Sequence, residues 1–193
     1  MNALTLNLPR SLKLTDEEFF ELATANRDLR IERTASGDLV IMPPTGGETG
    51  KHNANLTTEL VIWNRQTGLG VVFDSSTEFH LPQGGDRSPD VSWVRRERWE
   101  ALSDTQRKRF PPICPDFVIE LRSETDRLKE LQEKMQEYVN NGIRLGWLID
   151  PKTKTVEIYR QGQSVEILES PATLSGEDVL PGFVLDLQLI FDD

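Results

Sequence analysis

Apolar residues recur at helical spacing in two long segments of the chain. Leu56, Leu60 and Trp63 follow one another at i, i+4 and i+7, which predicts a helix over about residues 48–66. A second stripe consists of Leu128, Leu131, Met135 and Tyr138, and it ends at the C-cap signal Asn141-Gly142. We therefore expect two amphipathic helices, each with one face packed against the rest of the domain.

The N-terminal region combines a capped helix with alternating strands. Thr15 is followed three residues later by Glu18, a capping-box pattern that predicts a short helix within residues 14–27. The next stretch, "LRIERTASGDLVIMPP", alternates on both sides of Ser36-Gly37, which predicts a β-hairpin.

Five further segments have the length and residue content of strands: "LGVVFDSSTEFHLP", "SPDVSWVRR", "PDFVIELRSETD", "RLGWLIDP" and "KTVEIYRQG". Together with the helices they predict an α/β or α+β fold, in which helices flank a mixed β-sheet core. No repeat or linker divides the chain, so we expect a single domain over residues 1–193.

Composition excludes several classes of protein. A net charge of −10, from 22 basic and 32 acidic residues, argues against a protein that coats duplex DNA by counterion release. The single cysteine, Cys114, cannot form an internal disulfide, and the N-terminal residues show no signal-peptide pattern. No apolar run approaches the roughly 18 residues of a membrane span. We therefore expect a cytoplasmic protein without a membrane segment.

One segment departs from the acidic average. Residues 95–110, "RRERWEALSDTQRKRF", hold six basic and three acidic side chains. This segment is a candidate nucleic-acid contact, either in one chain or in a homodimer that brings two such edges together. The alternative is a solvated helix face.

The strand "PDFVIELRSETD" carries charges where a core strand is expected to be apolar. Side chains alternate along a strand, so Glu120 and Arg122 share one face while Phe117, Ile119 and Leu121 share the other. One face of this strand is therefore suited to the apolar core, and the other, ionisable face is suited to a catalytic or binding site.

A second acidic residue precedes another strand. Asp90 follows Ser88-Pro89 and opens "DVSWV". If this strand neighbours the one with Glu120, the two carboxylates converge on one oxygen-ligand site for Mg²⁺ or Mn²⁺, with the Leu121 carbonyl as a third ligand. Arg122 would then balance charge on a bound phosphate. Such an arrangement suits phosphodiester hydrolysis.

The segments "SPDVSWV", "PDFVIELRSETD" and "KMQEYVNNGIRLGWLIDP" resemble the Uma2 family, also known as DUF820, from about residue 14 to residue 187. Members of this family are abundant in cyanobacteria and resemble PD-(D/E)XK restriction-endonuclease-like nucleases. The resemblance implies that fold and an Mg²⁺- or Mn²⁺-dependent endonuclease acting on DNA. It assigns the motif acids to Asp90 and Glu120, and the acid of the first helix to Glu48.

The chain departs from the superfamily pattern at Arg122, where a lysine is expected. An arginine cannot take a proton from water because its pKa exceeds about 12. Lys134 flanks the apolar stripe of the following helix and is our candidate for the missing lysine, as some superfamily members carry theirs on a neighbouring helix. Arg122 would then act as an electrostatic clamp.

Each of these residues also has a structural interpretation. Asp90 can cap a turn, and Glu120 with Arg122 can form an ion pair on a half-exposed strand. Glu48 suits the first turn of a helix through the helix dipole, and Lys134 can be a solvated helix residue.

Three functions follow from these interpretations. The first is a metal-dependent endonuclease, and the second is a catalytically degenerate nuclease fold that works as a binding or regulatory module. The third is a glycosidase with a carboxylate pair, which needs neither a metal nor an adjacent cation.

Overall fold

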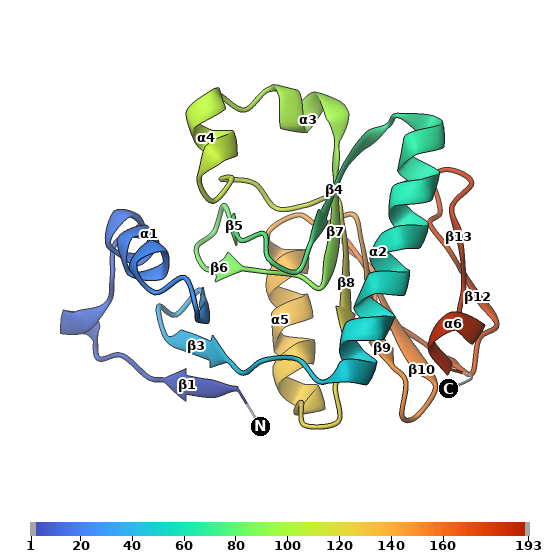
Figure 1. Cartoon of the computed structure of the whole chain (residues 1–193), viewed down its shortest axis with the longest axis horizontal. Coiled ribbons are helices and arrows are strands. Elements are labelled where there is room, and N and C mark those ends of the chain that lie inside the picture. The colour runs from blue at the N-terminus through green and yellow to red at the C-terminus, as the bar shows by residue number, and fades with distance from the viewer. Residues whose placement is uncertain (1–2, 192–193) are drawn as a thin grey trace.

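A six-stranded sheet forms the centre of the computed structural model, which describes residues 3–191 (Figure 1). Its strands lie in the order β11-β10-β9-β8-β7-β4. Their bounds are Gly70–Asp74 (β4), Val91–Arg95 (β7), Phe117–Leu121 (β8), Leu145–Asp150 (β9), Thr155–Arg160 (β10) and Glu166–Glu169 (β11). Strands β8 and β9 are parallel and the other neighbours are antiparallel. The sheet is mixed, as predicted from the sequence.

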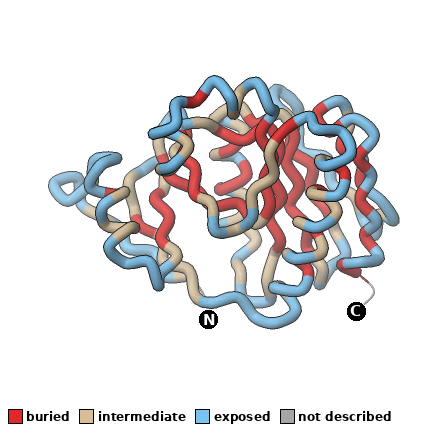
Figure 2. Tube along the Cα trace, turned by 45° about the horizontal axis from the view of Figure 1, so that its top comes forward, coloured by how far each residue is buried: buried red, intermediate tan, exposed pale blue. Residues whose placement is uncertain are grey.

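Helices α2 (Gly47–Thr67) and α5 (Leu128–Asn140) cover opposite faces of this sheet. One core cluster joins the α2 stripe to alternate residues of the central strands, among them Leu60, Ile119 and Trp147. The other joins α5 to the intervening residues, among them Met135 and Val118. Figure 2 shows the buried segments gathered in the central strands. Both amphipathic helices predicted from the sequence are confirmed.

Gly146 of β9 allows α5 to pack closely on the sheet. A Cβ added at this position would lie 2.6 Å from the terminal methyl group of Met135, a side chain that is fully buried. Because Gly146 has no side chain, Met135 can approach β9 closely, which helps to set the distance between α5 and the sheet. Lys134, the preceding residue of α5, is positioned by the same packing.

A second sheet, formed mainly by the N-terminal region, has the strand order β1-β3-β2-β6-β5. Its strands are Leu4–Leu6 (β1), Arg30–Arg33 (β2), Leu39–Met42 (β3), Phe79–His80 (β5) and Asp86–Arg87 (β6). A 3₁₀ helix spans Arg10–Leu12, and helix α1 (Asp16–Ala25) packs on this sheet through Phe19, which contacts Ile31 and Leu39. The predicted hairpin is β2 and β3, with Gly37 at φ +85° in its turn.

The predicted capping box at the start of α1 is confirmed. The Thr15 hydroxyl accepts a hydrogen bond from the Glu18 amide at 3.3 Å, and the Glu18 carboxylate accepts one from the Thr15 amide at 2.8 Å. Two otherwise unsatisfied amides of the helix start are thereby paired.

The stretch "LGVVFDSSTEFHLP" is two strands in different sheets, and not the single strand expected from the sequence. Asp74 ends β4, where its Oδ1 accepts hydrogen bonds from the amide and the hydroxyl of Ser76. This local turn breaks the strand and directs β5 to the second sheet.

The remaining elements lie at the ends of the central sheet. The basic segment forms α3 (Arg96–Glu100) and α4 (Asp104–Lys108), and the C-terminal region contains β12 (Thr173–Ser175), β13 (Val184–Asp186) and α6 (Gln188–Phe191). Between residues 3 and 191, no helix has both the length and the apolar content of a transmembrane segment.

Candidate functional site

A cleft of about 1310 Å³ lies between the second sheet and the helical side of the central sheet. Its lining comes from β2 and β3, the start of α2, the end of β8, the loop after β8 and helix α5. Ten acidic and four basic side chains line it. Ionisable groups are therefore concentrated where the two sheets meet.

Asp90 and Glu120 lie on neighbouring strands at this cleft. Strands β7 and β8 pair antiparallel with Val91 opposite Ile119, so the preceding residue Asp90 comes opposite Glu120. Asp90 Oδ2 accepts a hydrogen bond from the Leu121 amide at 2.9 Å. Asp90 Oδ1 accepts one from Asn53 Nδ2, on α2, at 3.0 Å. These bonds fix the orientation of the Asp90 carboxylate.

Glu120 is 3 % exposed, and its carboxylate contacts two groups of α5. Its Oε1 accepts a hydrogen bond from the Tyr138 hydroxyl at 2.9 Å and forms an ion pair with Lys134 Nζ at 2.8 Å. Desolvation raises the pKa of Glu120 to about 7, although Lys134 opposes this effect. Desolvation also raises the pKa of Asp90, against the hydrogen bond from Leu121.

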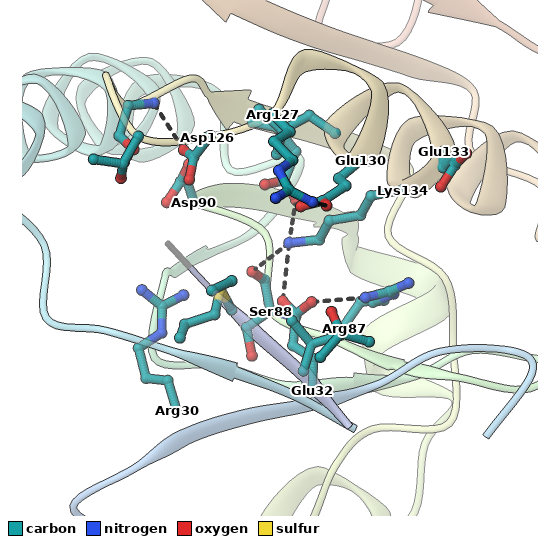
Figure 3. A pocket seen from close by; sticks show the side chains of 18 of the residues that line it. Arg30, Glu32, Arg87, Ser88, Asp90, Asp126, Arg127, Glu130, Glu133 and Lys134 are labelled. Carbon is teal, nitrogen blue, oxygen red and sulfur yellow. Dashed lines mark hydrogen bonds and ion pairs between the residues drawn. The ribbon is translucent and has the colours of Figure 1, made fainter. Parts of the chain in front are cut away.

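Lys134 connects the two sheets through its ammonium group. Besides Glu120, Nζ contacts Glu32 Oε1 at 2.9 Å and donates to the Ser88 carbonyl at 3.2 Å (Figure 3). Burial alone would lower the pKa of Lys134, but Glu120 and Glu32 outweigh it and the pKa is raised. Without a ligand, the side chain is therefore an ammonium donor.

Glu32 is a central residue of this network that the sequence interpretation missed. It is 2 % exposed, and it accepts hydrogen bonds from Lys134, from the Ser88 amide and from Arg87 NH1. Arg87 also pairs with Glu137 of α5. Burial opposes ionisation of Glu32, yet Lys134 and Arg87 hold its pKa below the usual value. The signal was available in "RIER", since a glutamate inside a strand is as unusual at position 32 as at position 120.

The other predicted residues lie apart from this network. Glu48 lines the cleft from the first turn of α2, where it is exposed. Arg122 does not line the cleft: its NH1 pairs with Asp150 Oδ2 at 2.6 Å, and its Nε donates to the Asp126 carbonyl. The structure thus brings Asp90, Glu120, Leu121 and Lys134 together but directs Arg122 toward the end of β9.

The donor set at Asp90 and Glu120 fits a small divalent cation. Two carboxylates and the Leu121 carbonyl are hard oxygen donors, and Mg²⁺ is held by one or two carboxylates with water completing its shell. Within residues 3–191, no group of three or more His, Cys, Asp or Glu side chains has the arrangement of a metal site. Any cation here would therefore rely on main-chain and water or substrate oxygens as well.

The basic segment lies far from these carboxylates. Strand β7 starts next to Asp90 and runs five residues, about 16 Å, before α3 begins. Figure 1 shows α3 and α4 at the top of the molecule. Arg98, Arg107 and Arg109 pair there with Asp116, Asp104 and Glu17.

Comparison with known proteins agrees with this fold. A solved structure described as "a putative nuclease belonging to DUF820", from Anabaena variabilis, is 19% identical to the chain, with a TM-score of 0.79. The match covers 93% of this chain and 98% of that one. No curated protein matches the sequence. The profile of the Uma2 family, described as "Putative restriction endonuclease", matches residues 16–188. The chain therefore belongs to the Uma2 family.

Proposed function

We propose that the protein is a metal-dependent endonuclease that hydrolyses phosphodiester bonds in DNA. The observation that carries the proposal is the convergence of Asp90, Glu120 and Lys134 at one cleft. The family description "Putative restriction endonuclease" and the likeness to "a putative nuclease belonging to DUF820" support it.

Asp90, Glu120 and the Leu121 carbonyl would hold Mg²⁺ or Mn²⁺. When bound, such an ion polarises a phosphoryl oxygen as a Lewis acid and favours ionisation of an attacking water. The Leu121 amide and Asn53 keep the Asp90 carboxylate oriented for this role.

Lys134 contributes a positive charge beside the carboxylates. Its ammonium lies 2.8 Å from Glu120 Oε1, so it can donate to a phosphoryl oxygen or to the attacking water. The Tyr138 hydroxyl donates to the same oxygen, Glu120 Oε1, and helps to orient this carboxylate. Arg122 forms its ion pair with Asp150 outside the cleft, so its contribution would be structural.

A second candidate is a nuclease fold that binds a partner without turnover. Acidic residues outnumber basic ones by ten to four around the cleft, which disfavours a polyanion. A divalent cation would offset part of that charge, so metal binding separates the two candidates.

The test combines calorimetry with cleavage of supercoiled plasmid, single-stranded DNA and branched DNA in Mg²⁺ or Mn²⁺. Wild type should bind Mn²⁺ and cut at least one substrate, whereas Asp90→Asn and Glu120→Gln should do neither while remaining folded. Glu133→Gln is the matched control, because Glu133 lines the outer cleft and pairs with Lys129. Equal Mn²⁺ affinity in wild type and both carboxylate variants would remove the metal site. Metal binding without cleavage of any substrate would favour the binding module.

A further inference from the structure

Arg30 belongs to the cleft through the alternation of β2. Arg30 and Glu32 line the cleft, whereas Ile31 and Arg33 face α1, where Arg33 pairs with Asp16. The strand that carries the buried Glu32 therefore presents an arginine two residues earlier on the same face.

The other three cations of the cleft each have an ion-pair partner in the protein. Lys134 is paired with Glu32 and Glu120, and Arg87 with Glu32 and Glu137. Arg127 pairs with Glu130 at 3.1 Å. Within residues 3–191, Arg30 makes neither an ion pair nor a side-chain hydrogen bond. Among the described residues, Arg30 is thus the cleft cation that no direct ion pair or side-chain hydrogen bond engages, although its charge acts electrostatically on the Asp90 carboxylate.

The surroundings of Arg30 favour a strong contact with an anion. Its β3 partner is Met42, and Met42, Val40 and Pro43 also line the cleft, so the half-buried side chain lies beside apolar groups. Figure 3 shows its guanidinium pointing across the cleft toward Asp90. A partly desolvated guanidinium without a direct ion-pair partner gains more from a phosphate than a fully hydrated one would.

We propose that Arg30 is a substrate-positioning residue that binds a phosphate group of the nucleic acid at the Asp90–Glu120 site. This inference rests on the proposed function. It assigns the clamp role, which the sequence suggests for Arg122, to a residue of the second sheet. The planar guanidinium offers two parallel donors to the non-bridging oxygens of one phosphate.

The kinetic test compares Arg30→Met, Arg30→Lys and Lys129→Met in steady-state cleavage of a labelled oligonucleotide. Loss of one charge-assisted contact should lower kcat/KM of Arg30→Met about ten- to a hundredfold, mainly through KM. Arg30→Lys should lie between that variant and wild type, because lysine keeps the charge but not the two parallel donors. Lys129→Met should stay within about twofold, because Lys129 lies outside the cleft lining and pairs with Glu133. Thermal unfolding of each variant verifies the fold.

A binding measurement tests the contribution of Arg30 to nucleic-acid affinity without cleavage. Fluorescence anisotropy of a fluorescein-labelled 12-nucleotide single strand, in Ca²⁺ and over a range of salt concentrations, gives affinity and its salt dependence. Arg30→Met should weaken binding at least fivefold and reduce the slope of log K against log salt by about 0.7, the value for one phosphate contact on a single strand. If wild type binds the strand but cleaves no substrate, the proposed endonuclease function fails. Weaker binding and a smaller slope in Arg30→Met would still support Arg30 as a phosphate contact. Unchanged affinity and slope in Arg30→Met, or no binding by wild type, would overturn the assignment.

Discussion

The two faces of the central sheet both have an apolar core, but only the face under α5 also carries a buried ionic network. Under α2, alternate residues of β7, β8 and β9 form a cluster of apolar side chains that includes Leu60, Phe117 and Trp147. Under α5, apolar packing around Met135 gives way near the end of β8 to the buried Glu120, which Lys134 and Tyr138 contact. One face of the sheet is thus apolar throughout, whereas the other combines an apolar core with an ionic network.

The comparison separates what stabilises the fold from what positions the site. The stabilisation from apolar burial is roughly proportional to the area buried, and an apolar core tolerates substitutions that conserve side-chain volume. A buried ionic network contributes little net stability, because desolvation offsets attraction, but loss of one member leaves an uncompensated charge. Substitutions on the two faces should therefore differ in their effects on activity, pH dependence and stability.

The largest effect is expected for Lys134→Met. The substitution leaves Glu32 and Glu120 without their shared cation, so the free energy of unfolding should fall by about 3–5 kcal/mol. Cleavage should fall about a hundredfold or more, as for loss of a proton-transfer or charge-balancing group. Urea denaturation and single-turnover kinetics measure the two losses.

Lys129→Met is the control for that substitution, since Lys129 is an exposed residue of the same helix that pairs with Glu133. This substitution should lower the free energy of unfolding by less than about 0.5 kcal/mol. Full activity of Lys134→Met would show that the ionic face has no chemical role.

On the apolar face, Leu60→Ala should lower stability without changing the chemistry. Leu60 is fully buried, and truncation of a buried leucine costs about 2–5 kcal/mol. The Mn²⁺ affinity, measured by calorimetry at a temperature where the variant is folded, should match wild type. A large loss of metal affinity would mean that the two faces are not independent.

Glu78→Gln should change how stability depends on pH. Glu78 is 9 % exposed, and burial, with Glu32 and Asp86, raises its pKa to about 9 from a usual 4.5. Between these values the folded chain binds the proton more tightly than the unfolded chain, so stability falls as pH rises from about 5 to 9. Removal of this group should make that slope less negative by up to about 1.4 kcal/mol per pH unit. Urea denaturation from pH 5 to pH 8 measures the slope, and identical slopes would contradict the prediction.

The smallest effect is expected for Arg122→Lys. A lysine keeps the charge and can still pair with Asp150, and the position lies outside the cleft. We expect kcat/KM within about threefold of wild type in the same cleavage assay. Inactivity of this variant would indicate that the guanidinium itself contacts substrate, which would favour the clamp role suggested by the sequence.

The sequence predicted those features that depend on neighbouring residues. Helical periodicity located α2 and α5, and a capping pattern located the start of α1. Strand parity predicted the face of Glu120, and the adjacency of β7 and β8 then brought Asp90 opposite it. In each case the signal lies within one element or between two adjacent strands.

Long-range packing explains what the sequence did not reveal. Parity places Arg122 on the face of Glu120 but says nothing of its partner, which is Asp150 on the next strand. Glu32 and Arg30 join the site only because the second sheet packs beside α5. No periodicity links β2 to a helix that follows about a hundred residues later, although the charged alternation in "RIER" marks the strand as unusual.

The ion pair between Glu32 and Lys134 also has a consequence for biosynthesis. The two residues are 102 positions apart in the chain, and Asp90 lies between them. Because the ribosome makes the chain from its N-terminus, a nascent chain that ends before residue 134 contains Asp90 but lacks the ammonium beside it. Contacts of such long sequence separation also form slowly, because closing the loop between them costs entropy. The order of synthesis therefore keeps the site incomplete until the second sheet and the first three strands of the central sheet, β4, β7 and β8, have been made.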